Sequence, residues 1–258
     1  MAAAIITGAS AGIGREFARI CARDGYDPVL IARSESQLQS LAAEIHQRTN
    51  RTVVVLPMDL SRPSAPHEVF QEVTRAGLSV EVLINNAGFG LLGRFWEVDE
   101  SQQVDMIQVN ITALTHLTRL FLPGFIKRRH GSILNVASTA AFQPGPLMSV
   151  YYATKSYVVS FSEAIHNEAR DHGVTVTCLC PGPTKTEFQK RAGASNTKLF
   201  NSGLFMDPAI VAEIGWNAMK AGKPLVIAGR LNATMAFLTR FAPIQFAASM
   251  ARRVQETK

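Results

Sequence analysis

Residues 2–14 read A-A-A-I-I-T-G-A-S-A-G-I-G, an apolar run that leads into Gly8, Gly12 and Gly14. Apolar side chains then recur at helical spacing as far as Arg23, so this part of the chain predicts a strand, a glycine turn and a helix. Glycine lets the backbone approach a ligand closely, and the first N–H groups of a helix are unpaired donors for phosphate. The spacing G-x-x-x-G-x-G is a variant of the dinucleotide-binding pattern G-x-G-x-x-G.

The end of the next apolar run, 28–31, indicates which dinucleotide would bind. An acidic residue about 20 positions beyond such a glycine turn accepts the ribose 2′-OH of NAD. Here the run ends in Ala32 and Arg33 instead. A guanidinium suits a ribose 2′-phosphate, so the sequence favours NADP(H) over NAD(H). The alternative is that Arg33 is a solvated residue at the start of a helix over 34–49, which would leave the missing acid unexplained.

Strand and helix patterns alternate along the chain. Short apolar runs typical of buried strands recur at 2–6, 28–31, 52–56, 82–84, 132–136 and 174–179. Helical periodicity is found between them, at 15–23, 34–49, 65–76, 101–129 and 149–172. This alternation predicts an α/β fold with a parallel sheet, and no break in composition indicates a second domain.

Tyr151 and Lys155 are four residues apart in the last of these helices. That separation places both side chains on one helical face, where the ammonium would favour the phenolate and lower the pKa of the tyrosine. Such a pair is a plausible acid and base. Taken alone, however, a Tyr and a Lys at this separation more often mark an ordinary helix surface.

Six motifs along the chain resemble those of the classical short-chain dehydrogenase/reductase family. They are T-G-A-S-A-G-I-G at 7–14, N-N-A-G at 85–88, Asn110, Ser138 placed thirteen residues before Tyr151, Y-x-x-x-K at 151–155, and Pro181-Gly182 with Thr186. The resemblance extends over essentially the whole chain. It implies a doubly wound, seven-stranded parallel Rossmann sheet in a single domain, with 225–227 as the last strand, and hydride transfer with a nicotinamide cofactor.

The resemblance also implies roles for four catalytic residues. Tyr151 would protonate a carbonyl oxygen during reduction, and Ser138 would hold that oxygen. Lys155 would bind the nicotinamide ribose and depress the pKa of Tyr151, while Asn110 would support a water that links Lys155 to solvent. Tyr152 has no lysine four residues later, which favours Tyr151 as the acid.

A further set of residues is expected to bind the cofactor. In the family, matching positions line the pyrophosphate, the adenine and its ribose, and the carboxamide of the nicotinamide. The predicted set is Gly8, Ser10, Gly12, Ile13, Gly14, Arg33, Asp59, Leu60, Asn86, Ala87, Gly88, Tyr151, Lys155, Pro181, Gly182, Thr184 and Thr186. A second basic residue that the family often carries inside the glycine turn is absent here, because that position is Ala11.

Composition excludes few classes of protein. The net charge is +6, but the basic residues are scattered, so nucleic-acid binding is not expected. The three cysteines lie in apolar surroundings without ligand-like spacing, which predicts buried thiols and no metal site. The N-terminus lacks the pattern of a signal peptide, and no apolar run is long enough to span a bilayer, so a cytoplasmic protein is expected.

The substrate side is expected to be apolar. Its predicted walls are 89–96, 142–148 and 188–206, with about 185–206 forming a lid that holds Leu199, Phe200, Leu204 and Phe205. These side chains favour a small apolar carbonyl or alcohol substrate, although each aromatic could equally pack the lid onto the core. The basic, apolar tail at about 230–258 is expected to pack on the pocket or on another subunit of a homodimer or homotetramer. Contact of this tail with a membrane is the less favoured alternative.

Three functions remain open from the sequence. The first is an NADP(H)-dependent carbonyl reductase, and the intact set of Ser138, Tyr151 and Lys155 favours it. The second is a non-catalytic sensor or scaffold that binds NADP, and the third is a peripheral membrane reductase of lipid-like 3-oxo compounds.

Overall fold

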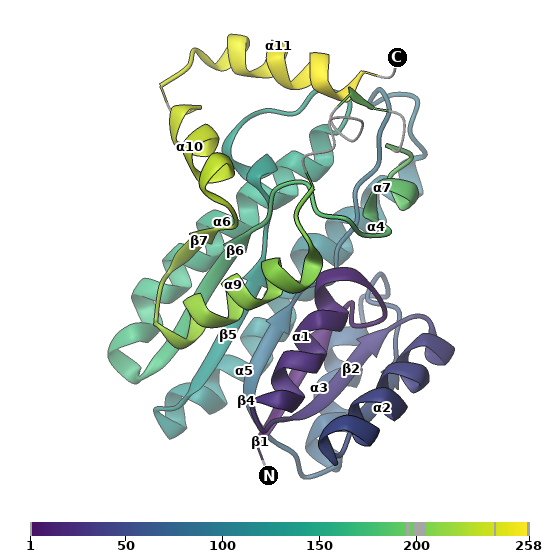
Figure 1. Ribbon diagram of the computed structural model, residues 1–258, viewed down its shortest axis with the longest axis vertical. Helices are drawn as coiled ribbons and strands as arrows, with labels where there is room; N and C mark the ends of the chain where they lie inside the picture. The colour runs from purple at the N-terminus through teal and green to yellow at the C-terminus, as the bar shows by residue number, and fades with distance from the viewer. Residues whose placement is uncertain (1, 195–196, 199–204, 240, 257–258) are drawn as a thin grey trace.

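Seven parallel strands form the centre of the molecule, in the order β3-β2-β1-β4-β5-β6-β7 (Figure 1). The computed structural model describes residues 2–194, 197–198, 205–239 and 241–256. The strands are β1 Ala2–Thr7, β2 Asp27–Ala32, β3 Val54–Pro57, β4 Ser79–Asn85, β5 Gly131–Val136, β6 Val174–Cys180 and β7 Leu225–Ile227. The predicted fold class and the position of the last strand are confirmed.

Helices cover both faces of this sheet (Figure 1). They are α1 Gly12–Arg23, α2 Glu35–Thr49, α3 Ala65–Arg75, α4 Glu100–Ile107, α5 Leu114–Arg128, α6 Ser149–Ala169, α7 Phe188–Arg191, α9 Pro208–Lys220, α10 Arg230–Leu238 and α11 Ile244–Gln255. Adjacent strand residues point to opposite faces, so Ile6 packs with α1, α2 and α9 whereas Ile5 packs with α3, α5 and α6. Both faces of the sheet are therefore buried, which explains why its strands read as continuous apolar runs.

The direction of strand addition reverses between β1 and β4. From β1 the chain adds β2 and β3 on one side, and then returns to add β4 to β7 on the other. In open parallel sheets a ligand binds in the crevice at such a reversal, outside the carboxyl ends of the strands. The glycine turn after β1 and the N-N-A-G turn after β4 both lie at this place.

The predicted helix over 101–129 is divided into three parts. A π-helical turn, Gln108–Ala113, separates α4 from α5 and contains the buried Asn110. Single π-turns inside helices are often found at functional sites, because the extra residue redirects side chains and backbone groups. Pro123 lies inside α5.

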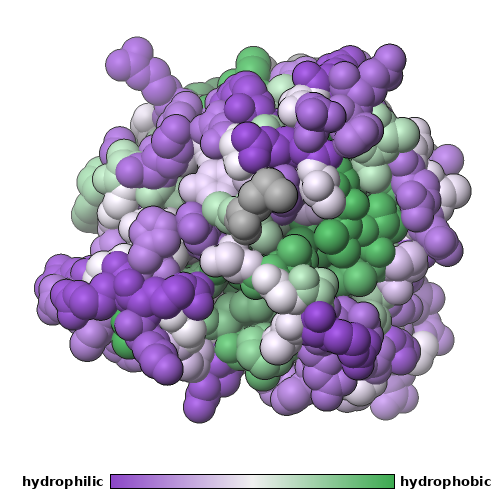
Figure 2. Space-filling model, turned by 90° about the horizontal axis from the view of Figure 1, so that it is seen from below, coloured by the Kyte–Doolittle hydropathy of each residue, from purple (hydrophilic) through white to green (hydrophobic). Residues whose placement is uncertain are grey.

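The chain after β7 forms two helices that lie at one end of the molecule, beyond the carboxyl ends of the strands (Figure 1). Pro243 immediately precedes α11 and is its N-cap residue. In the described parts of the chain, no helix has the length and hydrophobicity that crossing a membrane requires. The opposite end of the molecule is mainly hydrophilic at its margins, with a hydrophobic area beside its centre (Figure 2).

Candidate active site

The glycine turn forms a cradle that has no room for side chains. Gly8 and Gly12 have positive φ angles of 67° and 56°. A Cβ atom at Gly14 would lie 2.3 Å from the carbonyl oxygen of Gly8, and one at Gly12 would lie 2.9 Å from Cγ2 of Thr186. No side chain caps the N-terminus of α1, so its first N–H groups are available to an anion. The cradle therefore fits the pyrophosphate of a dinucleotide, with Ser10 and Ile13 half-buried beside it.

Thr7 and Asn86 hold this cradle in place. The Thr7 hydroxyl accepts hydrogen bonds from the backbone N–H groups of Asn86 and Ala87, at 2.9 and 3.0 Å. The Asn86 side chain donates to the carbonyl oxygens of Thr7 and Gly8, at 2.9 and 3.3 Å. Sequence reasoning assigned no role to Thr7, although its place directly before the first glycine was a usable signal. The Asn86 amide, expected at the adenine ribose, is committed to the glycine turn.

Arg33 lies directly after β2 and is exposed. Its guanidinium forms no hydrogen bond or ion pair with any other residue that the structure describes. The N–H of Ala9 donates to the carbonyl oxygen of Ile31, so the end of β2 is tied to the glycine turn. An unpaired cation thus stands beside the cradle, where the adenosine end of a dinucleotide would lie.

Asp59 and Leu60 follow β3, at the same edge of the sheet. Leu60 is buried, and the Asp59 carboxylate accepts a hydrogen bond from the N–H of Ser61 at 3.0 Å. Met58 donates its N–H to the carbonyl oxygen of Ala32, which links the ends of β2 and β3. The predicted adenine-binding residues are therefore close to Arg33 along the sheet edge.

Ser138, Tyr151 and Lys155 come together at the carboxyl end of β5. Ser138 caps the short turn Thr139–Phe142, since its hydroxyl accepts from the N–H of Ala140 at 3.1 Å. A hydrogen bond between the Ser138 hydroxyl and the Tyr151 phenol lowers the pKa of the phenol. The Lys155 ammonium lies 5.8 Å from the centre of the Tyr151 ring. It donates to the carbonyl oxygen of Val136 at 2.8 Å.

The pKa of Tyr151 moves in the opposite direction from the one predicted. Burial raises it to about 12, and this effect exceeds the lowering by Ser138. Burial also lowers the pKa of Lys155 to about 8. Burial therefore outweighs the expected lowering of this pKa by the Lys155 ammonium, which lies beside the aromatic ring and bonds to the backbone. Tyr151 is consequently protonated at neutral pH, the state that an acid requires.

Asn110 joins the loop after β4 to α6. Its side chain donates to the carbonyl oxygen of Phe89 at 2.9 Å and to the Thr154 hydroxyl at 3.0 Å. Its own oxygen accepts from the N–H of Phe89 at 3.1 Å. A Cβ atom at Gly88 would lie 3.0 Å from that oxygen and 3.3 Å from the Lys155 nitrogen. Asn110 thus holds the loop close to Lys155, and its expected role in supporting a water stays a prediction.

The segment after β6 crosses back over the glycine turn. Pro181 accepts a hydrogen bond from the N–H of Thr139 at 2.8 Å, which fixes its position next to Ser138. The Thr184 hydroxyl donates to the carbonyl oxygen of Gly182 at 2.9 Å. Thr186 then lies over Gly12. Thr186 and Gly12, which are distant in the sequence and both belong to the predicted cofactor-binding set, are therefore in contact.

Apolar side chains surround the catalytic phenol. The ring of Phe188, at the start of α7, lies 5.2 Å from that of Tyr151. A Cβ atom at Gly90 would contact both of these rings and Met148. Leu91 and Leu92 pack in the same cluster. Part of the predicted apolar wall is present, but Phe95 and Trp96 are exposed. Leu199, Phe200 and Leu204 of the expected lid lie outside the described residues.

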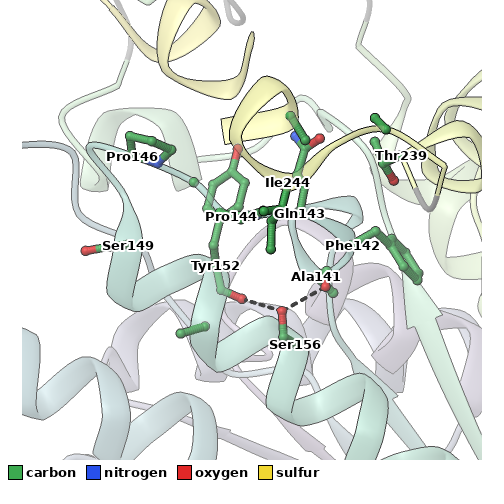
Figure 3. A pocket seen from close by; sticks show the side chains of 14 residues that line it. Ala141, Phe142, Gln143, Pro144, Pro146, Ser149, Tyr152, Ser156, Thr239 and Ile244 are labelled. Carbon is green, nitrogen blue, oxygen red and sulfur yellow. Dashed lines mark hydrogen bonds between the residues drawn. The ribbon is translucent and has the colours of Figure 1, made fainter. Parts of the chain in front are cut away.

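Tyr152 belongs to the same cluster, with its ring 6.1 Å from that of Tyr151, but its hydroxyl has a different partner. Its hydroxyl accepts a hydrogen bond from the Gln255 side chain at 2.9 Å, and its ring packs directly on Gly145. It lines a separate groove of about 730 Å³ between α6 and the C-terminal segment (Figure 3). Its position supports Tyr151, rather than Tyr152, as the residue placed for acid–base chemistry. The described residues contain no cluster of acidic, histidine or cysteine side chains arranged to bind a metal ion.

The family model for short chain dehydrogenases matches residues 2–197. The chain belongs to this family. A nicotinamide dinucleotide would bind across the cradle and the sheet edge described above.

Two curated short chain dehydrogenases are similar to this chain in sequence. A very-long-chain 3-oxoacyl-CoA reductase of Phaeosphaeria nodorum is 37% identical over 180 residues, which cover 68% of this chain and 53% of the relative. The 17-beta-hydroxysteroid dehydrogenase type 3 of Mus musculus is 35% identical over 199 residues, covering 76% and 64%. The chain thus spans only about half to two thirds of the length of these relatives.

Two solved structures match over nearly their full length. A short-chain dehydrogenase from Sphingobium yanoikuyae in complex with NADPH has a TM-score of 0.83 and 29% identity, covering 94% of this chain and 97% of that one. A bulky-bulky ketone specific alcohol dehydrogenase from Comamonas testosteroni has a TM-score of 0.79 and 27% identity, covering 93% and 92%.

Proposed function

We propose that this short chain dehydrogenase interconverts a bulky apolar ketone and its secondary alcohol with NADP(H). The observation that carries the proposal is the convergence of Ser138, Tyr151 and Lys155 inside an apolar wall. When bound, the dinucleotide supplies or accepts the hydride. Tyr151 places its proton on the carbonyl oxygen, and the Ser138 hydroxyl donates a hydrogen bond that holds this oxygen in line. Lys155 keeps a positive charge beside the phenol as it loses its proton.

The apolar wall supports a bulky substrate without a charged group near the reacting carbonyl. Phe89, Leu91, Leu92, Met148 and Phe188 surround Tyr151, and none of them can pair with a carboxylate or a phosphate. The free energy of binding to such a wall grows with the apolar surface that the ketone removes from water, so ketones with large apolar groups should bind best. The names of the relatives, a very-long-chain 3-oxoacyl-CoA reductase and a 17-beta-hydroxysteroid dehydrogenase, describe compounds in which an oxo or hydroxyl group is attached to a large apolar chain or ring system.

A second candidate is a reductase of long-chain 3-oxoacyl compounds. The name of the Phaeosphaeria nodorum relative supports it, as do the exposed apolar residues of the C-terminal helices. A panel tests both candidates: loss of NADPH absorbance is followed with an aromatic ketone, a 17-ketosteroid and a long-chain 3-oxoacyl thioester. Turnover restricted to the thioester selects the second candidate. If no member consumes NADPH although the cofactor binds, the chain acts as a sensor and both proposals fail.

Replacing Arg33 by Asp is expected to reverse the preference between the two dinucleotides. The unpaired guanidinium would bond to the 2′-phosphate of NADPH, whereas a carboxylate repels that phosphate and accepts from the 2′-OH of NADH. Loss of a charge-assisted hydrogen bond predicts a decrease in kcat/KM for NADPH of roughly 10- to 100-fold. The measurement is kcat/KM for each dinucleotide with one ketone.

The matched control is Arg48→Asp, an exposed arginine near the other end of α2. It should leave the ratio of the two kcat/KM values unchanged. If Arg33→Asp also leaves the ratio unchanged, Arg33 does not bind the 2′-phosphate and the assignment of NADP(H) loses its basis.

A further inference from the structure

The C-terminal helices pack with small side chains against the rest of the protein and with large apolar side chains toward solvent. Ala247, Ala251 and Gln255 of α11 are buried. They are spaced four residues apart, so they form one face of the helix, and the Gln255 side chain anchors it to Tyr152. A helix normally buries its large apolar residues against the core. We expected such packing for the tail, but the small residues make the contact.

The large residues form exposed stripes on both helices. On α11 the stripe is Phe246, Met250 and Val254, with exposed fractions of 60%, 45% and 38%. On α10 it is Leu231, Met235 and Leu238, with 62%, 57% and 53%. Each set recurs at intervals of three or four residues and therefore follows one side of its helix. We call these two stripes together the C-terminal apolar face.

The turn between the helices continues this face. Phe241 and Ile244 stand on either side of Ala242-Pro243, with exposed fractions of 73% and 70%. The Phe241 ring packs edge-on against Phe237, at 5.2 Å between centroids, rather than against the sheet. Apolar side chains of this size gathered on one surface element mark an interaction site.

All charged side chains within this segment are basic. From residue 230 to residue 255 the sequence contains no Asp or Glu. Arg230, Arg252 and Arg253 are exposed. Arg252 pairs with Glu256 at 3.3 Å, whereas Arg230 and Arg253 form no ion pair with another described residue. The surface thus combines apolar stripes with positive charge that its own segment does not neutralise.

We propose that α10 and α11 dock on the surface of an anionic lipid bilayer. The apolar stripes would enter the boundary between headgroups and acyl chains, and the arginines would contact the anionic headgroups. A second copy of the chain fits this face less well. A two-fold contact places the same patch on both subunits, so Arg230 and Arg253 would meet further arginines, and Glu256, the acidic residue beside this face, already pairs with Arg252. Both helices lie beyond residues 2–197, the part of the chain that the family model matches.

The docked surface is continuous with the groove beside Tyr152. Ile244 belongs to the exposed turn and also lines the groove, together with Thr239 and Ala247. Phe142 and Pro144 form part of the facing wall (Figure 3). An apolar compound that leaves the bilayer would therefore meet an apolar surface next to the helix that carries Tyr151.

Co-sedimentation of the full chain with vesicles tests the proposal. Vesicles of phosphatidylcholine with phosphatidylserine should bind the protein roughly tenfold more tightly than vesicles of phosphatidylcholine alone, and added salt should reduce the difference. The double variant Phe246→Ser/Met250→Ser should weaken binding to both kinds of vesicle. The charge variant Arg230→Glu/Arg253→Glu should abolish the preference for phosphatidylserine. Turnover of a water-soluble ketone reports separately on the catalytic site and should not change in either variant.

Matched controls remove exposed residues of the same kinds elsewhere. Val104→Ser/Ile210→Ser deletes two apolar side chains that are 58% and 56% exposed on α4 and α9. Lys127→Glu/Lys223→Glu reverses two exposed charges outside the C-terminal helices, on α5 and between α9 and β7. Both controls should bind vesicles like the unmodified chain. The proposal is overturned if the chain ignores vesicles, if the controls weaken binding equally, or if Phe246→Ser/Met250→Ser instead dissociates an oligomer, which would assign the face to a contact between copies.

Discussion

Replacing Tyr151 by Phe is expected to lower the rate of ketone reduction by about 10²- to 10⁴-fold, the usual contribution of a positioned general acid. The substitution removes one oxygen atom and leaves the ring, which packs against Phe188, in place. Because burial raises the pKa of the phenol to about 12, the native residue holds its proton until a carbonyl oxygen takes it. Turnover is measured with saturating NADPH, and the dissociation constant of NADPH is measured separately.

Tyr152→Phe is the matched control for this experiment. It removes the same atom from the next residue, which is also buried. The lost hydrogen bond from Gln255 leaves a buried donor unpaired, so the thermal midpoint should fall while turnover stays near that of the unmodified chain. Should Tyr152→Phe abolish turnover while Tyr151→Phe retains it, the assignment of the acid would be wrong.

The fold was largely predictable because its strands are buried on both faces and its turns carry glycine. Short, mainly apolar runs such as 2–6 and 132–136, bounded by turn residues, are typical of strands buried on both faces, and the cradle at Gly8 and Gly14 requires residues without a Cβ atom. The π-turn around Asn110 was not predictable. It depends on hydrogen bonds from Asn110 to Phe89 and Thr154, which are distant in sequence and meet only in the folded chain.

The members of the site were predictable, but their ionisation was not. The spacing of Tyr151 and Lys155 placed both on one face of α6, as the structure has them. The direction of each pKa shift, however, depends on burial, and burial is set by Val136, Phe188 and other neighbours that the spacing does not reveal. The orientation of the C-terminal helices was not predictable from the sequence either. Its composition is apolar and basic, yet only the packing of Ala247 and Ala251 shows that the large side chains face outward.

Lys155→Met is expected to act on activity and on stability in opposite directions. Turnover should fall on the order of 10²-fold, because the variant lacks the positive charge that favours proton loss from Tyr151. Folding should become more favourable at neutral pH, because the lysine is buried and no carboxylate among the described residues pairs with its ammonium. The ammonium donates instead to the carbonyl oxygen of Val136, a neutral acceptor.

The pH dependence of the stability difference has a definite sign. Burial lowers the pKa of Lys155 from 10.5 to about 8, so between these values the unfolded chain holds a proton that the folded chain has released. The stability of the unmodified protein therefore rises with pH across this window. Below pH 8 the ammonium is charged in the folded state, and burying that charge lowers the free energy of unfolding by about 3 kcal/mol. Methionine removes that cost but also the hydrogen bond to Val136, worth about 1 kcal/mol. Lys155→Met should accordingly be more stable than the unmodified chain at pH 7 by about 2 kcal/mol, and slightly less stable near pH 10.5.

Urea unfolding of both proteins at several pH values measures this difference directly, since titrations common to both cancel. Leu225→Met, a half-buried position on β7 with no ionisable group, controls for the introduction of methionine and should give a difference that does not vary with pH. A Lys155→Met protein that is the less stable of the two already at pH 7 would mean that the buried ammonium is well compensated. The same ammonium would then hold its charge beyond pH 8, and its charge would be available to Tyr151 over the whole range in which the enzyme is folded.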